Sequence, residues 1–191
     1  EQLGRSQQQR QRSRAQRWQR RRSHAHQMKK AIVALAVLVA VGIGAWFVMR
    51  PAQTAPDVTF TTLEGKTFSM QDLRGKVVLV KFWATSCVTC VKQMPETISA
   101  YNEYAGKGYE AIAVAMNYDP PNFVLNFAES RKLPFPVALD TKGDIARAFG
   151  DIRLTPTAFL IDKKGHVIKR YLGEYDVAEF HATVEKALAA G

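Results

Sequence analysis

The chain has 191 residues, 47% of them hydrophobic, which is enough for one packed domain with additional segments. Its formal net charge of +10 lies at one end, because residues 1–30 hold ten basic residues and one acidic residue, while residues 51–191 hold 16 of each. A folded part without net charge is not expected to bind nucleic acid. Two cysteines are too few for a disulfide-stapled miniprotein or a four-cysteine zinc site.

The first thirty residues are rich in arginine and glutamine and poor in apolar side chains, which predicts a disordered basic tail over residues 1–30. Such a tail either contacts anionic lipid or RNA, or only orients the chain. Met28 and the two lysines after it also have the form of a start of translation. In that case the natural chain begins at Met28, and residues 1–27 are a mis-assigned extension of it.

Residues 31–49 carry no charge. A helix of this length, at ~1.5 Å per residue, nearly spans a hydrocarbon core of ~30 Å. The basic residues before it place the N-terminus in the cytoplasm and the later residues outside. We therefore expect a single-pass signal anchor in the cytoplasmic (inner) membrane, with the following domain on the periplasmic, extracytoplasmic side. The alternative is a cleaved signal peptide, for which the small residues at 42–44 offer a cleavage site.

Residues 50–56 contain two prolines and predict an extended linker, after which residues 57–191 alternate between strand-like and helix-like patterns. This order predicts an α/β fold with a mixed central sheet and helices on both faces, preceded by the N-terminal transmembrane helix. Asp176 is the expected N-cap of the last helix. The expected elements are a hairpin over 58–60 and 67–68, a buried strand 77–83, a helix 88–105, a buried strand 110–116, a helix 122–132, a strand 136–139, a helical turn 144–149, strands 157–161 and 167–171, and a helix 176–190.

The two cysteines, Cys87 and Cys90, lie between the first buried strand and the first long helix. A cysteine at a helix N-terminus is stabilised as a thiolate by unpaired backbone N–H groups and by the helix dipole. Two intervening residues bring the second thiol within reach of the first for an internal disulfide. We therefore expect Cys87 to attack a disulfide and Cys90 to resolve the mixed disulfide that forms.

Other interpretations of the cysteine pair fit the sequence less well. A structural zinc site needs a second pair of ligands, and none of the four histidines has a metal-binding spacing to the pair. Covalent haem attachment needs a histidine directly after the second cysteine, where Val91 stands. Redox chemistry that needs neither a metal nor an organic cofactor is therefore expected, and an extracytoplasmic location agrees with it.

The segment 82–90, Phe-Trp-Ala-Thr-Ser-Cys-Val-Thr-Cys, resembles the active-site stretch of the thioredoxin superfamily. The resemblance covers roughly residues 57–190. Over this range the chain is similar to the membrane-anchored TlpA/ResA-like branch of thiol:disulfide oxidoreductases. The resemblance implies a thioredoxin-like fold. Further matching stretches are residues 72–76, 94–96 and 154–162.

The resemblance also implies roles for three residues near the pair. Pro156 is implied to be a cis-proline that faces the cysteines, with the backbone of Thr155 hydrogen-bonding a bound substrate chain. Without the resemblance, Pro156 would be interpreted as a strand-entry residue, since only ~5–6% of X–Pro bonds are cis. Trp83 is implied to pack beside the disulfide as part of the substrate-binding site, while it also serves as a core aromatic at a strand end.

The chain departs from the family pattern at two positions. Thioredoxins have a buried aspartate six residues before the first cysteine, where this chain has Lys81, and TlpA/ResA-like proteins often have a glutamate in place of Gln93. A lysine in a buried strand is costly unless it is paired, hydrated or neutral. One hypothesis is that Lys81 stabilises a thiolate and lowers the pKa of a cysteine; the alternative is that its amine reaches water at a strand edge. Glu96 is a further candidate proton carrier.

The resulting prediction is an extracytoplasmic thiol:disulfide oxidoreductase that reduces client proteins through Cys87 and Cys90. By resemblance, its electrons come from a membrane donor, and its clients belong to cytochrome c or copper-site assembly. We expect a membrane-anchored monomer that acts on protein disulfides. Two alternatives remain open: a disulfide oxidase or isomerase on the same fold, and a metal-delivery chaperone that uses both cysteines as ligands.

Overall fold

A computed structural model describes residues 38–42, 44 and 53–190, and the chain divides into two compact units, residues 1–51 and 52–191. In the first unit, residues 38–42 and 44 are helical. The expected basic tail and most of the expected membrane anchor lie outside the described residues. Within the described ranges, no helix combines the length and the apolar content needed to cross a membrane.

A five-stranded mixed sheet forms the centre of the second unit. The strands of the unit are β1 (Thr59–Thr61), β2 (Thr67–Ser69), β3 (Val77–Trp83), β4 (Tyr109–Ala115), β5 (Val137–Leu139), β6 (Thr157–Ile161) and β7 (Val167–Leu172). The sheet has the order β5-β4-β3-β6-β7, and β1 and β2 form a separate antiparallel hairpin. β3, β4 and β5 run parallel, whereas β6 is antiparallel to both β3 and β7.

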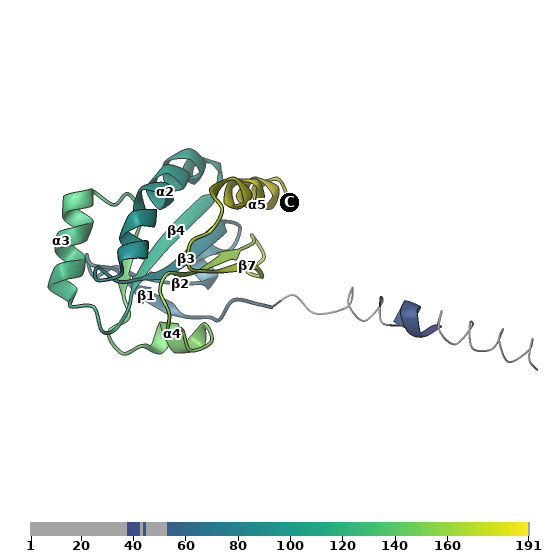
Figure 1. The fold of residues 1–191 in the computed structure, drawn as a ribbon, viewed down its shortest axis with the longest axis horizontal. Helices are drawn as coiled ribbons and strands as arrows, with labels where there is room; N and C mark the ends of the chain where they lie inside the picture. Colours follow the sequence, from purple (N-terminus) through teal and green to yellow (C-terminus); the bar gives the residue numbers. More distant parts are fainter. Residues whose placement is uncertain (1–37, 43, 45–52, 191) are drawn as a thin grey trace, which may run out of the picture. The chain divides into compact units, whose positions relative to one another are not determined.

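Helices cover both faces of this sheet. They are α2 (Val88–Tyr104), α3 (Pro121–Arg131), α4 (Asp144–Ala148) and α5 (Val177–Ala189). α2, α3 and α5 pack on one face, in the apolar cluster that contains Trp83 and Phe180. α4 and the hairpin cover the other face, in the cluster that contains Phe60 and Phe149. Figure 1 shows α2 and α5 on the opposite side of the sheet from α4.

β3 is the central strand, and all seven of its residues are buried. Alternate side chains of a strand point to opposite faces, so Leu79 and Trp83 join the cluster under α2, while Val80 and Phe82 join the other. A strand covered on both faces requires a nearly continuous apolar sequence. Lys81 is the exception in this strand, and its surroundings are described with the site.

Every strand and helix expected in the domain is present, and each end lies within one residue of its expected position. The prediction of an α/β fold with a mixed central sheet and flanking helices is confirmed. Two short 3-10 turns, Gln71–Leu73 and Ala105–Lys107, were not expected. The second of them ends α2 at Tyr104, and Gly108, with φ 92°, then turns the chain into β4.

Asp176 caps α5, since its Oδ1 accepts a hydrogen bond from the backbone N–H of Glu179 at 2.8 Å. Asp176→Ala should lower the free energy of unfolding by about 1 kcal/mol, because this N–H loses its acceptor. Asp176→Asn should retain most of the stability, since the amide oxygen can accept the same bond. Urea denaturation of both variants checks the cap, and an alanine variant as stable as the natural chain would contradict it.

Candidate active site

The cysteine pair lies at the beginning of α2, where Cys87 is the N-cap residue. Cys87 and Cys90 form a disulfide, with their Cα atoms 5.2 Å apart. The backbone N–H of Cys90 donates to the Sγ of Cys87 at 3.2 Å. Cys87 is half-buried, whereas Cys90 is 0% exposed. A sulfur that approaches from outside therefore reaches Cys87 first, which supports the predicted division into an attacking and a resolving cysteine.

The end of β3 determines where the pair lies. β3 ends at Trp83, residues 84–86 turn, and α2 begins one residue after Cys87. The backbone N–H of Cys87 donates to the carbonyl of Ala84 at 3.1 Å, which closes this turn. The Cys87 sulfur therefore lies at the N-terminus of α2, where it accepts the N–H of Cys90 and where the helix end favours a thiolate.

The peptide bond between Thr155 and Pro156 is cis, as the resemblance implied. In the antiparallel register of β3 and β6, Phe82 pairs with Thr157, so Pro156 lies beside the end of β3 from which the cysteine turn leaves. Among the described residues, neither the backbone N–H nor the carbonyl of Thr155 has a hydrogen-bond partner. These two groups are therefore free to pair with an extended chain, as the predicted substrate-binding role requires.

Trp83 is 0% exposed, and it shares the apolar cluster under α2 with Cys90. Its ring centroid lies 5.0 Å from that of Phe127 on α3. The implied packing of Trp83 near the cysteine pair therefore agrees with the structure. Because the indole has no exposed surface, it supports the site from inside the core, and its predicted contribution to substrate binding is indirect.

Lys81 lies on the face of β3 that α2 covers, and it is 1% exposed. Its Nζ donates to Thr97 Oγ1 at 2.9 Å and to Gln93 Oε1 at 3.4 Å. The ring centroid of Tyr175 lies 5.7 Å from the same Nζ. Gln93 and Thr97 follow Cys90 by three and seven residues, so the amine lies under the helix face that carries the resolving cysteine.

Burial lowers the pKa of Lys81 to about 8, and the negative charge of Glu96 opposes this shift. At neutral pH the amine is therefore mainly a buried cation, and two neutral side chains accept its hydrogen bonds. The alternative that Lys81 reaches water at a strand edge is wrong, because β3 lies between β4 and β6 and the side chain is covered. The hypothesis that Lys81 stabilises a thiolate stays a prediction.

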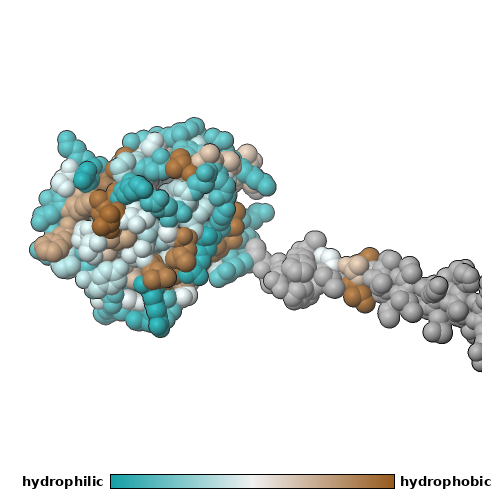
Figure 2. Space-filling view, viewed as in Figure 1, coloured by the Kyte–Doolittle hydropathy of each residue, from teal (hydrophilic) through white to brown (hydrophobic). Residues whose placement is uncertain are grey.

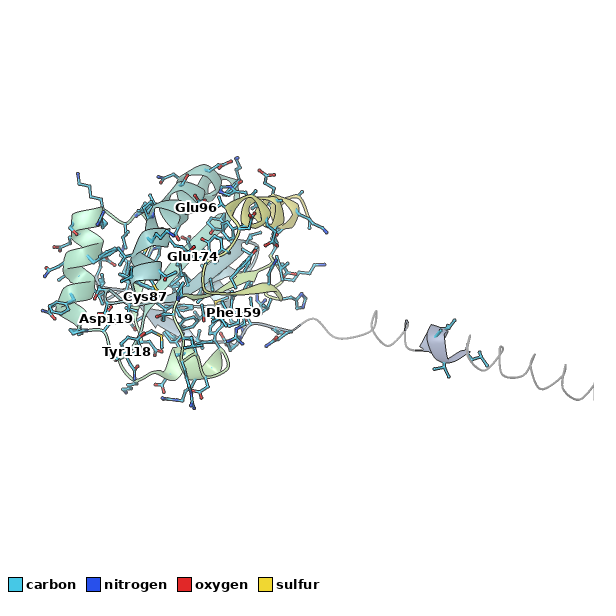
Figure 3. The ribbon with its side chains drawn as sticks, viewed as in Figure 1. Cys87, Glu96, Tyr118, Asp119, Phe159 and Glu174 are labelled. Carbon is cyan, nitrogen blue, oxygen red and sulfur yellow. A yellow bond between two sulfur atoms is a disulfide. The ribbon has the colours of Figure 1, made fainter. Side chains whose placement is uncertain are left out.

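Gln93 and Glu96 lie in different surroundings on α2. Gln93 is 8% exposed and belongs to the polar group around Lys81. Glu96 is half-buried, and Figure 3 shows it on α2 near α5. Its Oε1 lies 2.8 Å from Nε2 of His181 on α5. Glu96 thus connects the two helices, and it influences Lys81 through its charge. Its predicted role as a proton carrier stays a prediction.

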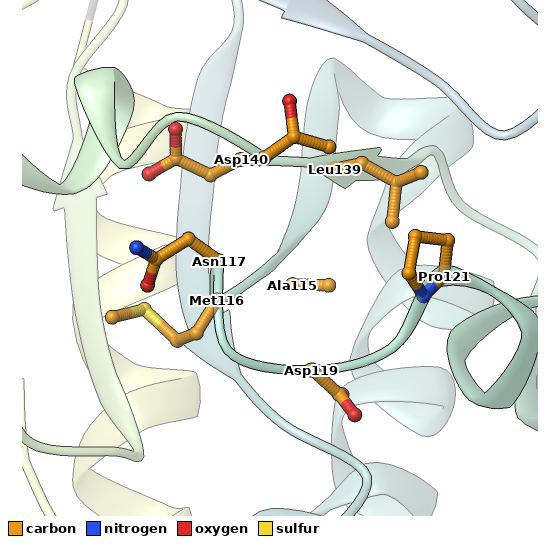
Figure 4. Close-up of a pocket in the computed structure, with 8 residues that line it drawn as sticks. Ala115, Met116, Asn117, Asp119, Pro121, Leu139 and Asp140 are labelled. Carbon is orange, nitrogen blue, oxygen red and sulfur yellow. The ribbon is translucent and has the colours of Figure 1, made fainter.

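Sequence reasoning missed a buried carboxylate beside the cysteine turn. Asp119 is 5% exposed, and its carboxylate accepts hydrogen bonds from the backbone N–H and the Oγ1 of Thr85, both at 2.6 Å. Figure 4 shows Asp119 in the loop between Ala115, the last residue of β4, and Pro121, the first residue of α3. The adjacent parallel strands β3 and β4 end at the same edge of the sheet, so a polar residue soon after the second strand was a usable signal.

Reversible disulfide exchange is the chemistry open to this cysteine pair, and on a sheet of this topology it defines a thioredoxin-like thiol:disulfide oxidoreductase. Comparison with known proteins agrees. Residues 50–188 match the Redoxin family, and the chain belongs to that family. The predicted resemblance to ResA-like oxidoreductases is confirmed, while the membrane anchor stays a prediction.

Three relatives illustrate the similarity. The chain is 39% identical over 138 residues to the thiol-disulfide oxidoreductase ResA of Bacillus thuringiensis subsp. konkukian, which covers 72% of this chain and 79% of the relative. A thiol:disulfide interchange protein of the thioredoxin family from Chlorobium tepidum has 30% identity and a TM-score of 0.67, over 73% of this chain and 99% of that one. StoA from Bacillus subtilis has 26% identity and a TM-score of 0.58, over 69% of this chain and 98% of that one.

Replacement of Lys81 by methionine should change how stability depends on pH. Between pH 8 and 10.5 the folded chain has lost the Lys81 proton, while the unfolded chain keeps it at the ordinary pKa of 10.5. The unfolded state then binds more protons, so this group makes the free energy of unfolding rise with pH, with a slope of up to ~1.4 kcal/mol per pH unit. Lys81→Met should lack this rise.

Urea denaturation of the oxidised chain at pH 7, 8, 9 and 10 measures the effect. The quantity of interest is the difference between the natural chain and Lys81→Met, because the ionisation of the tyrosines affects both. A difference that stays constant from pH 7 to 10 would show that the buried amine keeps its ordinary pKa. Lys66→Met is a matched control, since Lys66 is exposed.

Proposed function

We propose that this protein reduces disulfides in client proteins outside the cytoplasm, with residues 31–49 holding its catalytic domain at the membrane. The observation that carries the proposal is the half-buried Cys87 at the N-terminus of α2, bonded to the fully buried Cys90. The uncharged segment 31–49 supports membrane attachment. The resemblance to ResA-like oxidoreductases supports the reductive direction, and it is also the basis for clients in cytochrome c or copper-site assembly.

The reaction begins from the reduced pair. The Cys87 thiolate attacks one sulfur of a client disulfide, the client S–S bond breaks, and the other client sulfur leaves as a thiolate. Cys90 then loses its proton and attacks Cys87 Sγ, which forms the internal disulfide and releases the second client sulfur. The client gains two electrons and the pair loses two. A membrane donor of two electrons must then reduce the Cys87–Cys90 disulfide before the next cycle.

Two groups of residues assist these steps in the proposal. The free backbone groups of Thr155 align the client chain beside Cys87, in the manner of an added β-strand. Lys81, a buried cation at neutral pH, favours the thiolate of the resolving cysteine under α2. Thr155 positions the client disulfide before Cys87 attacks it, and Lys81 prepares the Cys90 thiolate before it attacks Cys87.

Single cysteine variants should separate the two steps. Cys90→Ser should keep the first attack but not the second, so the variant should accumulate a mixed disulfide with a client protein or peptide. Cys87→Ser should form no such adduct, because the remaining cysteine is buried. Non-reducing gel electrophoresis with mass spectrometry identifies the adduct. An adduct that forms equally with Cys87→Ser would reverse the assigned roles.

The reduction potential of a fragment spanning residues 51–191 tests the direction. Equilibration with glutathione or dithiothreitol buffers should give a value near or below the ~−270 mV of thioredoxin, as a reductase fed by a dedicated donor requires. A value near ~−120 mV would instead indicate an oxidase. If no reversible Cys87–Cys90 disulfide forms while Cu(I) binds stoichiometrically, metal delivery replaces disulfide exchange as the function.

A further inference from the structure

One loop touches both halves of the candidate site. Asp119 holds Thr85, two residues before Cys87, through two hydrogen bonds of 2.6 Å. The preceding residue, Tyr118, has its hydroxyl 3.3 Å from Oγ1 of Thr155, which precedes the cis-proline. Figure 3 shows Tyr118 and Asp119 in the same part of the domain as Cys87. Adjacent residues of the loop between β4 and α3 therefore contact the cysteine turn and the cis-proline loop.

The two residues of this loop differ in exposure. Asp119 is 5% exposed and hydrogen-bonded, so it fixes the position of the loop, whereas 55% of the Tyr118 surface is open to solvent. A large aromatic side chain is thus held beside the free backbone groups of Thr155. Leu154, 64% exposed, and Val88, 82% exposed, add apolar surface next to Thr155 and Cys87 in the sequence. Figure 2 shows apolar patches among polar side chains on the face in view.

A pocket of about 310 Å³ adjoins Tyr118. Its lining combines the apolar residues Met116, Ala146 and Ile152, each at most 5% exposed, with the polar residues Asn117 and Asp151. Two arginines also line the pocket, and each is paired: Arg153 with Asp151, at 2.8 Å from its Nε, and Arg147 with Asp144. Since these charges are compensated, the pocket suits an uncharged side chain better than an anion.

We propose that Tyr118 and this pocket recognise an apolar side chain of the client, next to the cysteine that Cys87 attacks. The inference rests on the proposed function and makes it more specific. A client chain that pairs with the backbone of Thr155 passes the Tyr118 ring, because the hydroxyl of Tyr118 touches the Thr155 side chain. Alternate side chains of an extended chain point to the same side, so a residue close to the client cysteine can enter the pocket.

The volume of the pocket fits this occupant. At about 310 Å³ it lies at the low end of the ~300–1,000 Å³ of small-molecule sites, which is enough for one large aliphatic or aromatic side chain. Tyr118 supplies flat apolar area at a low cost in conformational entropy, as aromatic residues do at binding surfaces. Tyr118 is therefore assigned as a specificity-determining residue that contacts the client but takes no part in the sulfur chemistry.

The test compares two disulfide peptides with the reduced full-length chain. The peptides are identical except that the residues flanking one cysteine are leucine in the first and serine in the second. The measured quantity is the ratio of their second-order rate constants of reduction. The natural chain should prefer the leucine peptide by about tenfold, a typical value for one apolar contact. Tyr118→Ala should bring the ratio close to one, whereas Tyr118→Phe should preserve it.

A matched control is Phe123→Ala. Phe123 is also 55% exposed but does not line the pocket, so this variant should leave both rate constants unchanged. Tyr118→Phe also separates apolar recognition from the contact with Thr155, because only the hydroxyl is lost. A ratio near one for the natural chain, or a Tyr118→Ala variant that slows both peptides equally, would overturn the proposal.

Failure of the proposed function has a different signature. The natural reduced chain is also assayed with bis(2-hydroxyethyl) disulfide, which has no side chain to place in the pocket. If neither this compound nor either peptide is reduced, disulfide reduction itself is wrong. If all three are reduced without a preference between the peptides, disulfide reduction stands and only recognition through Tyr118 is wrong.

Discussion

The site depends on one constraint, the pairing of β3 on both of its edges. Parallel pairing with β4 and antiparallel pairing with β6 fix the place where β3 ends, and the cysteine turn leaves from that end. The same pairing places the loop after β4 and the cis-proline before β6 at this edge of the sheet. Cys87, Asp119 and Thr155 are far apart in the sequence, and the strand pairing brings their loops together.

A lysine in the middle of this strand has a cost that the rest of the fold must offset. Lys81 is the one charged residue of β3, and a buried charge is destabilising unless its hydrogen bonds are satisfied. Thr97 and Gln93 of α2 accept two of its hydrogen bonds, and the ring of Tyr175 lies near the amine. An apolar residue would fill the same place without this cost. Local rules of this kind are broken most often at functional sites, which supports the hypothesis that Lys81 acts on the cysteine pair.

Local sequence patterns were sufficient to predict the fold and the place of the cysteine pair. The burial of β3, the capping of α5 by Asp176 and the turn before Cys87 each depend on residues that are close together in the sequence. The contacts that shape the site are not local. Asp119 hydrogen-bonds to Thr85, which is 34 residues away in the sequence, and Tyr118 contacts Thr155, which is 37 residues away. The periodicity of apolar residues does not predict such pairs. The alternative that the Lys81 amine reaches water at a strand edge was wrong for the same reason. Only the order of the strands shows that β3 has a neighbour on each side and therefore no free edge.

A stabilising effect of Lys81 on the reduced cysteine pair would oppose the proposed reductive direction of electron flow. A cation near the pair stabilises a thiolate, and every interaction that favours the reduced pair over the disulfide makes the protein a weaker reductant. The oxidised pair carries no thiolate that could offset the charge of Lys81. In that state the negative charge of Glu96, one turn after Gln93 on α2, is the main charge that offsets it. Glu96, in turn, is tied to His181 on α5. If Lys81 stabilises the Cys90 thiolate as proposed, its balance with Glu96 trades driving force for speed of attack. The proposed membrane donor, which renews the dithiol, would then supply the driving force that remains.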